Sequence, residues 1–245
     1  MLYSDPFEEP PSRWRFGRRV ELGRTPLLVP VHPGKIVGIG RSYAEHAREL
    51  GNEVPGEPIV FLKSPGSVIG PGVPIVLPPE SAQVEFEGEI AVVLREALRR
   101  PTRRQVENAI LGITAACDVT ARDLQRRDKT FARGKSFDTF CPLGPAIRVA
   151  PDWENLEVIT RLNGEERQRG RGELMLWDIF EMVRYVASCM SLERGDVVLT
   201  GTPAGVGKLA PGDRLEVEVA QVGILENPVE AWLAPKISEP DPAGP

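Results

Sequence analysis

Three glutamates that alternate within one apolar stretch are the first residues in this chain whose spacing could support chemistry. In a β-strand over Val84–Leu94, the side chains of Glu85, Glu87 and Glu89 share one face, because side chains alternate with a period of two. The same face becomes apolar farther along, which favours a covered face. Carboxylates on a covered face repel one another and lose hydration, and a hard cation relieves both costs. The pattern thus predicts a metal site, with a solvated strand face bearing three surface glutamates as the alternative.

A fourth carboxylate, Asp118, stands at the end of the mostly apolar stretch Ile113–Cys117. An acidic side chain at the end of a buried strand needs a partner. Asp118 could supply the third carboxylate to a metal held by Glu87 and Glu89. The alternative is that Asp118 is the N-cap of a helix that starts at Val119.

A histidine and a glutamate three residues apart form the next candidate pair. His46 and Glu49 lie in a predicted helix over 44–50, and this spacing places them on one helix face. A carboxylate beside an imidazole orients the ring and raises its basicity, as a general base requires. The alternative is an exposed helix with a polar face.

Lys63 directly follows the apolar run Ile59–Leu62, so the base of its side chain is expected to be buried. The alternative is a lysine at the strand end whose ammonium group reaches water. Farther along, Lys129–Asp138 reads as a polar loop, and loops supported by a rigid sheet often carry ligand contacts.

Two glycine-rich turns could be mistaken for nucleotide-binding loops. Gly38-Ile39-Gly40 lacks the third glycine and the following βαβ unit of a dinucleotide site, and Gly201–Gly207 lacks the Gly-Lys-Ser/Thr ending of a phosphate loop. A nucleotide-dependent enzyme is therefore disfavoured. The backbone N–H groups of Gly201–Gly207 could still hold a carboxylate.

The elements that must position these residues are mainly strands. We expect a small N-terminal β region over 1–33, with a hairpin over 13–22 and a strand over 25–31. A main domain over 34–234 carries the candidate residues, and a mobile Pro-rich tail covers 235–245. Within the domain, helices are predicted at 102–111, 120–126 and 176–190. Besides 84–94 and 113–117, strands are predicted at 35–40, 58–62, 71–79, 144–149, 157–162, 165–169, 196–200, 214–219 and 222–232.

Composition excludes several classes of function. The 245-residue chain has a formal net charge of −5 and no long basic run, which argues against nucleic-acid binding. No apolar run reaches membrane-spanning length, and no signal-peptide pattern opens the sequence, so we expect no membrane partner and a cytoplasmic location. Three widely spaced cysteines indicate free thiols.

Taken in order, six stretches resemble the motifs of the fumarylacetoacetate hydrolase family and together span residues 35–230. One departure is Ser42, where many members carry Asn. The matching stretches are Gly38–Tyr43 with His46 and Glu49, Phe61–Lys63, Val84–Leu94, Cys117–Gln125, Gly134–Asp138 and Leu199–Gly207.

The resemblance implies a mixed, mainly β fold of the α+β class around a rolled β-sheet, and a homodimer. It implies Mg²⁺ or Mn²⁺, with Ca²⁺ as a substitute in crystals, bound by Glu87, Glu89 and Asp118. Glu85 takes a position that is acidic in the family without being a direct ligand. The resemblance also implies catalytic roles for His46, Glu49 and Lys135, and substrate contacts from Arg41, Lys63, Arg122, Gln125 and Thr202.

The activity implied by the resemblance is metal-dependent chemistry on 2-oxo and 2-hydroxy-dienoic dicarboxylates of aromatic catabolism, through a stabilised enolate. The leading expectation is a 2-hydroxyhepta-2,4-diene-1,7-dioate isomerase, with or without decarboxylase activity. The alternatives are an acylpyruvate or fumarylpyruvate-type C–C bond hydrolase and an oxaloacetate decarboxylase. A non-catalytic β domain with a structural metal is the alternative from another class.

Overall fold

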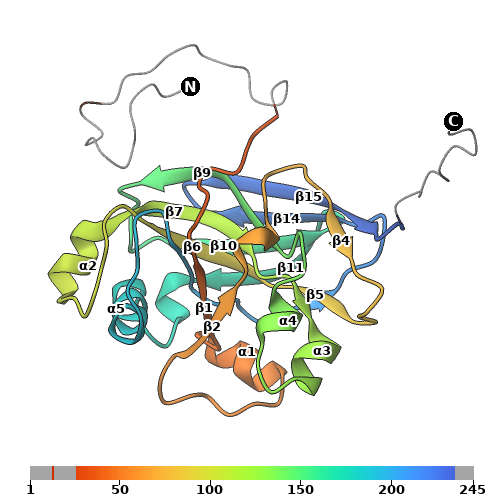
Figure 1. Cartoon of the computed structure of the whole chain (residues 1–245), viewed down its shortest axis with the longest axis horizontal. Coiled ribbons are helices and arrows are strands. Elements are labelled where there is room, and N and C mark those ends of the chain that lie inside the picture. The colour runs from red at the N-terminus through yellow and green to blue at the C-terminus, as the bar shows by residue number, and fades with distance from the viewer. Residues whose placement is uncertain (1–12, 14–25, 235–245) are drawn as a thin grey trace, which may run out of the picture.

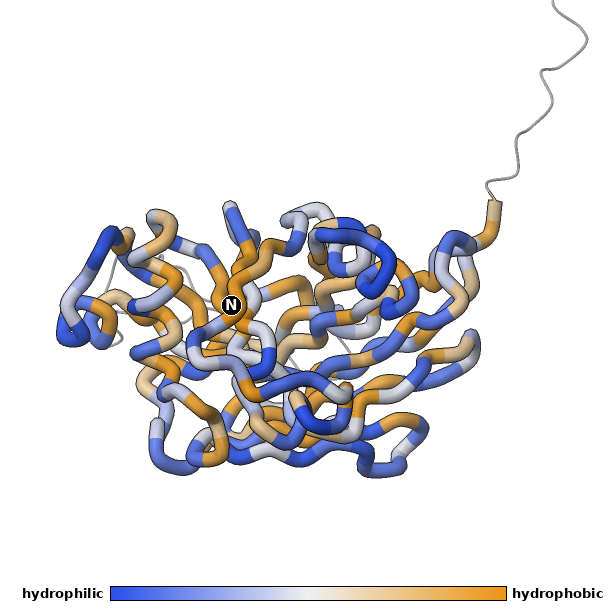
Figure 2. Tube along the Cα trace, turned by 90° about the horizontal axis from the view of Figure 1, so that it is seen from below, coloured by the Kyte–Doolittle hydropathy of each residue, from blue (hydrophilic) through white to orange (hydrophobic). Residues whose placement is uncertain are grey.

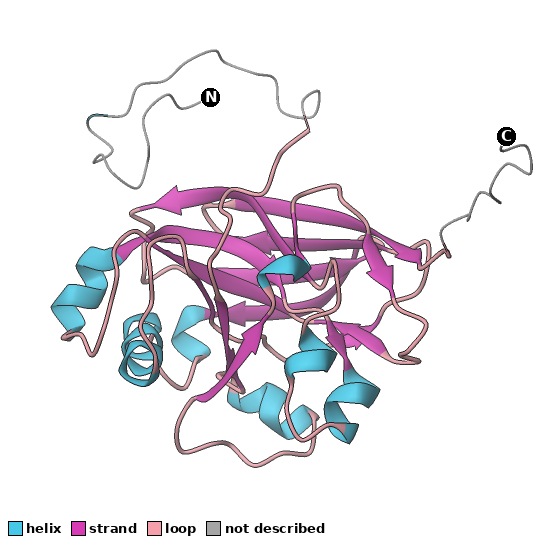
Figure 3. Ribbon diagram, viewed as in Figure 1, coloured by secondary structure: helices cyan, strands magenta, loops and turns pink. Residues whose placement is uncertain are grey.

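Apolar stretches of the sequence form three β-sheets in the computed structural model, which describes residue 13 and residues 26–234 (Figures 1 and 3). The largest sheet has seven strands in the order β2-β1-β12-β6-β7-β9-β3. Its central strands β6 and β7 are buried along their whole length, as their runs of apolar and small residues predict. The strand bounds are β1 Ile36–Gly40, β2 Ile59–Lys63, β3 Val68–Ile69, β6 Gly88–Leu94, β7 Ile110–Cys117, β9 Cys141–Val149 and β12 Val197–Leu199.

A second sheet of five strands, in the order β11-β10-β14-β15-β4, packs against the first through contacts of β10 and β14 with β6 and β7. The core cluster includes Ile90 and Val92 from one sheet and Val217 from the other. In Figure 2, apolar residues follow the strands through the middle of the molecule, and peripheral loops are mostly hydrophilic. The strand bounds are β4 Ile75–Leu77, β10 Glu157–Leu162, β11 Glu165–Arg171, β14 Arg214–Val219 and β15 Gly223–Ala231.

The hairpin of β10 and β11 confirms the turn predicted at Asn163-Gly164. Both residues have positive φ angles, 55° and 83°. Asparagine and glycine tolerate this left-handed conformation, which a tight hairpin with right-handed twist requires.

The acidic stretch predicted as one strand forms two, which is a correction to the sequence-based expectation. Residues Val84–Phe86 form β5 in a third sheet with β8 (Thr120–Ala121) and β13 (Gly207–Lys208), whereas β6 starts at Gly88 in the large sheet. Glu87 lies between them, where the chain passes from one sheet to the other. A Cβ atom on Gly88 would lie 1.9 Å from Thr160 Oγ1, so this crossing requires glycine.

The helices lie at the edges of the sheets. In Figure 1, α1, α3 and α4 lie together beside one end of the large sheet, and α2 packs against α5 elsewhere. The bounds are α1 Ala44–Glu49, α2 Arg103–Ala109, α3 Arg122–Arg127, α4 Ala132–Lys135 and α5 Ile179–Cys189, with short 3₁₀ turns η2 Pro65–Ser67 and η3 Gly172–Leu174. No helix within residues 26–234 is long and apolar enough to cross a membrane.

Several predicted elements have different bounds in the structure. The helix predicted over 102–111 ends at Ala109, because β7 already begins at Ile110 and carries Gly112 within the strand. The helix predicted over 120–126 begins at Arg122, since Thr120 and Ala121 pair with β5. The predicted loop over 129–138 contains α4. The long helix begins at Ile179 rather than 176, because the Asp178 side chain caps it by accepting from the Glu181 N–H.

The N-terminal predictions fall partly outside the described residues. Residues 26–31 carry no strand, so the strand expected over 25–31 is wrong for the part that the structure describes. The hairpin expected over 13–22 lies outside the described residues except for residue 13, and the tail over 235–245 lies entirely outside them.

Candidate functional site

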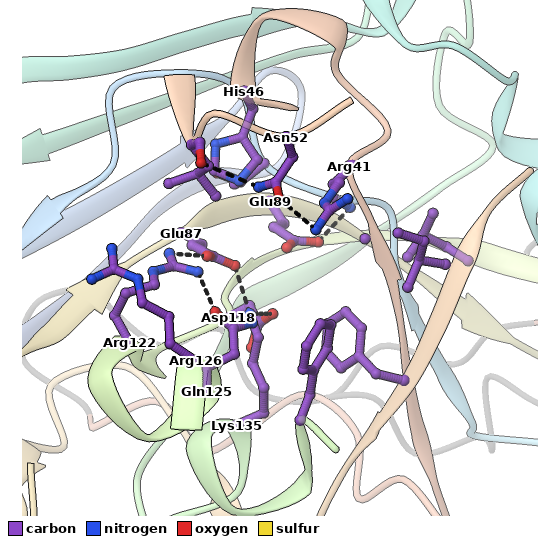
Figure 4. A pocket seen from close by; sticks show the side chains of 18 residues that line it. Arg41, His46, Asn52, Glu87, Glu89, Asp118, Arg122, Gln125, Arg126 and Lys135 are labelled. Carbon is purple, nitrogen blue, oxygen red and sulfur yellow. Dashed lines mark hydrogen bonds and ion pairs between the residues drawn. The ribbon is translucent and has the colours of Figure 1, made fainter. Parts of the chain in front are cut away.

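A cavity of about 340 Å³ opens at the edge of the large sheet, where β1, β7 and β12 end and β6 begins (Figure 4). Its polar lining comes from several elements that are distant in sequence. All predicted site residues line it except Glu49 and Lys63, each of which contacts a lining residue. The predicted residues in the lining are Arg41, His46, Glu87, Glu89, Asp118, Arg122, Gln125, Lys135 and Thr202.

Three buried carboxylates meet at the inner end of this cavity. Glu87, Glu89 and Asp118 each offer an oxygen, and these atoms all lie within 4.8 Å of one another. The register of β6 and β7 causes this meeting, because Gly88 pairs with Cys117 and the Asp118 N–H donates to the Glu87 carbonyl at 2.8 Å. The structure thus brings together the three predicted metal ligands.

The fourth acid, Glu85, stands apart from this cluster. Its carboxylate accepts from Arg122 Nε at 2.8 Å and from Gln83 Nε2 at 2.5 Å. The same guanidinium donates to Glu87 Oε1 and, at 2.6 Å, to Gln125 Oε1. Glu85 therefore holds Arg122 in place, and none of the three glutamates is the solvated surface residue of the alternative interpretation.

Two buried lysines contact Asp118, each at a different oxygen of its carboxylate. Lys63 Nζ donates to Asp118 Oδ1 at 2.6 Å and to the backbone carbonyls of Val119 and Lys135. Lys135 Nζ donates to Asp118 Oδ2 at 2.5 Å and to Glu87 Oε2 at 2.7 Å. The Lys63 side chain is fully buried, so the water-reaching alternative is wrong, and it lies behind the cavity wall rather than in the lining.

The helix-cap alternative for Asp118 is also wrong. The N-cap position of α3 is Ala121, and the Asp118 carboxylate accepts from the two lysines instead. Its backbone carbonyl accepts from Thr120 Oγ1 at 2.9 Å, which closes the turn between β7 and β8.

The pKa values of Glu87 and Glu89 shift in opposite directions because their neighbours differ. Burial opposes ionisation of Glu87, but the charges of Lys135 and Arg122 outweigh it and hold the pKa of this carboxyl well below its usual range. Burial and the negative charges of Asp118 and Glu87 raise the pKa of Glu89 well above its usual range. Glu89 is therefore the carboxylate whose charge the surrounding protein does not balance.

The donor set fits a hard divalent cation. Within 4 Å, Glu89 has no basic partner among the described residues, and it accepts one hydrogen bond from the Gly201 N–H at 2.6 Å. A divalent cation beside it would supply the missing positive charge, and carboxylate oxygens are the ligands that Mg²⁺ and Mn²⁺ prefer. Glu87, Glu89 and Asp118 would hold such an ion.

The predicted His–Glu pair forms at the cavity wall. His46 Nδ1 lies 3.2 Å from Glu49 Oε2, and Glu49 Oε1 accepts from the Gly205 N–H at 2.9 Å. His46 is buried, so the exposed-face alternative is wrong for this residue. Its Nε2 has no hydrogen-bond partner within the described part of the chain, which leaves that nitrogen available to a bound molecule.

The glycine-rich turn after β12 holds carboxylates, as its backbone N–H groups allow. Gly201 and Gly205 both have positive φ angles, 91° and 101°, and donate to Glu89 and Glu49 respectively. A Cβ on Gly205 would lie 2.0 Å from the Arg167 carbonyl oxygen. The turn therefore fixes one residue of the acidic cluster and one of the His–Glu pair.

Sequence reasoning missed Gln168 and several lining residues. Gln168 Nε2 donates to Thr202 Oγ1 at 2.7 Å, and Thr202 Oγ1 donates to the Gly88 carbonyl at 2.9 Å, so this hydroxyl is engaged within the protein. Gln168 gave no signal because it stands in a β11 stretch of charged residues. The missed lining residues include Leu50, Asn52, Ile59, Phe61, Arg126 and Phe131.

Comparisons with known proteins agree with this geometry. The family model described as Fumarylacetoacetate (FAA) hydrolase C-terminal matches residues 35–230. The solved 5-carboxymethyl-2-hydroxymuconate delta-isomerase of Mycobacterium smegmatis is 42% identical, with a TM-score of 0.83, covering 89% of this chain and 87% of that chain. The 2-hydroxyhepta-2,4-diene-1,7-dioate isomerase of Mycobacterium marinum is 37% identical, with a TM-score of 0.85, covering 94% and 86%. Oxaloacetate tautomerase YisK of Bacillus subtilis is 39% identical over 82% of this chain and 71% of its own length.

Proposed function

Because the chain belongs to the fumarylacetoacetate hydrolase family, we propose that it is a Mg²⁺- or Mn²⁺-dependent enzyme that moves protons on 2-oxo and 2-hydroxy-dienoic dicarboxylates, as a 2-hydroxyhepta-2,4-diene-1,7-dioate isomerase does. The observation that carries this proposal is the meeting of a buried trio of carboxylates and a His–Glu pair in one cavity. Two solved relatives named as isomerases support the same class of reaction.

The roles proposed for the residues follow from their contacts. When bound, the divalent cation supplies Lewis-acid stabilisation of a 2-oxo acid as negative charge grows on its 2-oxygen. Lys135 keeps a positive charge beside the proposed cation ligands. Burial lowers its pKa, but the negative charges of Asp118 and Glu87 outweigh burial and raise it. His46 takes up or returns the proton through Nε2, while Glu49 holds the ring by Nδ1.

A second candidate, keto–enol tautomerisation of oxaloacetate, is favoured by the relative YisK, which carries that activity in its name. It uses the same proton transfer on a shorter diacid. The hydrolase and decarboxylase alternatives use the same cavity but require, respectively, an attacking water and loss of a carboxyl group.

A substrate panel tests the proposal. The protein would be assayed with Mg²⁺ on 2-oxo-hept-3-enedioate, oxaloacetate and an acylpyruvate, and products would be identified by NMR. The proposal expects isomerised or tautomerised products without carbon loss. Cleaved acylpyruvate as the sole product would establish the hydrolase instead, and inactivity on all three would contradict the proposal.

The His–Glu pair separates these reactions further. For proton transfer or hydrolysis, His46→Ala should lower turnover by about 10²–10⁴, the usual contribution of a general base. Glu49→Gln should lower turnover in the same way. The double variant should lose little more turnover than the more impaired single variant, since the two residues act as one unit. Decarboxylation needs no general base to activate a water molecule, so a decarboxylase should keep most of its turnover in these variants.

The other histidine of the chain supplies the matched control. His32 is exposed and lies outside the cavity lining, so His32→Ala should keep the wild-type rate. Full activity of both His46→Ala and Glu49→Gln on every substrate would show that α1 is only scaffold.

A further inference from the structure

Two arginines in the cavity lining differ from the other cations there because they have no acidic partner. Arg122 and Lys135 are bound by the carboxylates of the site. Arg41 and Arg126 have no ion pair within 4 Å among the described residues: Arg41 Nη2 donates to the Asn52 amide oxygen at 2.9 Å. Arg126 makes a contact that is equally neutral and longer, from Nη1 to Gln83 Oε1 at 3.4 Å.

Arg126 is the less constrained of the two. It stands on α3 four residues after Arg122, so both side chains leave the same helix face. Arg122 is buried against the acidic cluster, whereas Arg126 is exposed. In Figure 4, Arg126 lies beside Arg122, on the opposite side of the cavity from Arg41. An exposed guanidinium with one long contact can turn toward a ligand at little cost in desolvation.

The charge of the cavity favours a ligand with two negative groups. Four cationic side chains (Arg41, Arg122, Arg126, Lys135) and three carboxylates line it, so its formal charge is +1 with His46 neutral. A divalent cation would raise that charge to +3. A ligand with one carboxylate, placed at the ion, leaves an excess of positive charge in the cavity. A second carboxylate on the ligand can offset part of this excess.

Apolar side chains in the same cavity suit the carbon chain between two such groups. Ile59, Phe61 and Phe131 contribute to the lining, and Phe61 packs edge-on against Phe131 with ring centres 6.0 Å apart. A ligand with acidic ends and an apolar middle therefore matches the lining better than a uniformly polar one.

We propose that Arg126 binds the carboxylate at the end of the substrate remote from the acidic cluster, and thereby selects diacids over monoacids. This inference rests on the proposed function, because it takes the 2-oxo acid end to lie at Glu87, Glu89 and Asp118. Arg126 binds the substrate and has no part in proton transfer.

Pairs of 2-oxo acids of equal length test this inference by binding alone. 2-Oxoglutarate would be compared with 2-oxopentanoate, 2-oxoadipate with 2-oxohexanoate, and 2-oxoheptanedioate with 2-oxoheptanoate, by calorimetry with saturating Mg²⁺. In the wild type, at least one of the three diacids should bind about tenfold tighter than the monoacid of equal length, as expected for one charge-assisted contact at a partly exposed site. Arg126→Gln should remove most of this advantage and leave monoacid binding unchanged.

Arg127→Gln is the matched control, because Arg127 is the next residue of α3, is exposed, and does not line the cavity. It should keep the full diacid advantage. An Arg126→Gln variant that also keeps it, or a wild type that binds each diacid and monoacid equally, would overturn the role of Arg126 while leaving the proposed function intact. A wild type that binds none of these acids would overturn both.

Discussion

At the scale of single residues, partners decide what each carboxylate does. Glu85 and Glu89 belong to the same alternation of glutamates, yet their partners differ. Glu85 is paired with Arg122, whereas Glu89 has no basic partner within 4 Å among the described residues and accepts from the Gly201 N–H. The alternation of glutamates predicted that they share a face. It could not predict this difference, because Arg122 is 37 residues from Glu85 in the chain.

Lys135 offers a prediction at this scale. Replacing it by Met should lower turnover by more than about tenfold, because a charge aimed at the growing negative charge is lost. Mg²⁺ binding should persist or tighten, since Lys135 competes for oxygens of Glu87 and Asp118. Steady-state kinetics and calorimetry measure the two effects separately.

Lys129→Met serves as the control for this variant, since Lys129 is an exposed lysine in the same segment before α4. It should match the wild type in both measurements. Undiminished turnover of Lys135→Met would make Lys135 a structural partner of the acids and nothing more.

At the scale of elements, long apolar or alternating stretches were predictable and short elements were not. The strands β1, β2, β10 and β14 and the turn at Asn163 follow from local sequence. The two-residue strands β8 and β13 and the four-residue helix α4 exist through pairing with β5 and packing against β2 and α3. Such contacts between distant segments leave no periodic signal.

Lys63 connects three segments that are distant in the sequence. Its ammonium group ties β2 to the loop after β7 and to the end of α4. Lys63→Met should destabilise the protein by about 3–5 kcal/mol, the usual cost of removing one partner of a buried ion pair. Among the described residues, Asp118 would keep only Lys135 as a basic partner, and two backbone carbonyls would lose a buried donor. Urea unfolding followed by circular dichroism measures this. The exposed Lys208→Met should stay within about 0.5 kcal/mol of the wild type, and equal stability of both variants would refute the anchoring role of Lys63.

At the scale of the whole molecule, the site sits where the edge of the large sheet meets the three short helices α1, α3 and α4, so cation binding should couple to global stability. A cation that binds only the folded protein stabilises it by about 2.7 kcal/mol at a hundredfold excess over Kd. For a chain of this size, the midpoint of thermal unfolding should rise by roughly 5–10 °C. Scanning calorimetry with Mg²⁺ and then with a chelator measures the shift, which Na⁺ at equal ionic strength should not reproduce.

The register of β6 against β7 determines the site at this scale, and the sequence alone could name its residues but not their distances. Family resemblance supplied the set Glu87, Glu89 and Asp118, and the structure brings their oxygens within 4.8 Å. The placement of Lys63 behind the wall and the cavity position of Arg126 depend on how α3 and α4 pack, which local patterns do not encode.

Calorimetric titration of Mg²⁺ tests the central claim, that the three buried carboxylates hold a divalent cation, most directly. The wild type should bind one ion per chain, and Glu87→Gln, Glu89→Gln and Asp118→Asn should each weaken binding by at least about tenfold, or 1.4 kcal/mol. Glu85→Gln should change it far less, because that carboxylate is occupied by Arg122. Unchanged Mg²⁺ affinity in all three cluster variants, or no binding to the wild type, would contradict the claim.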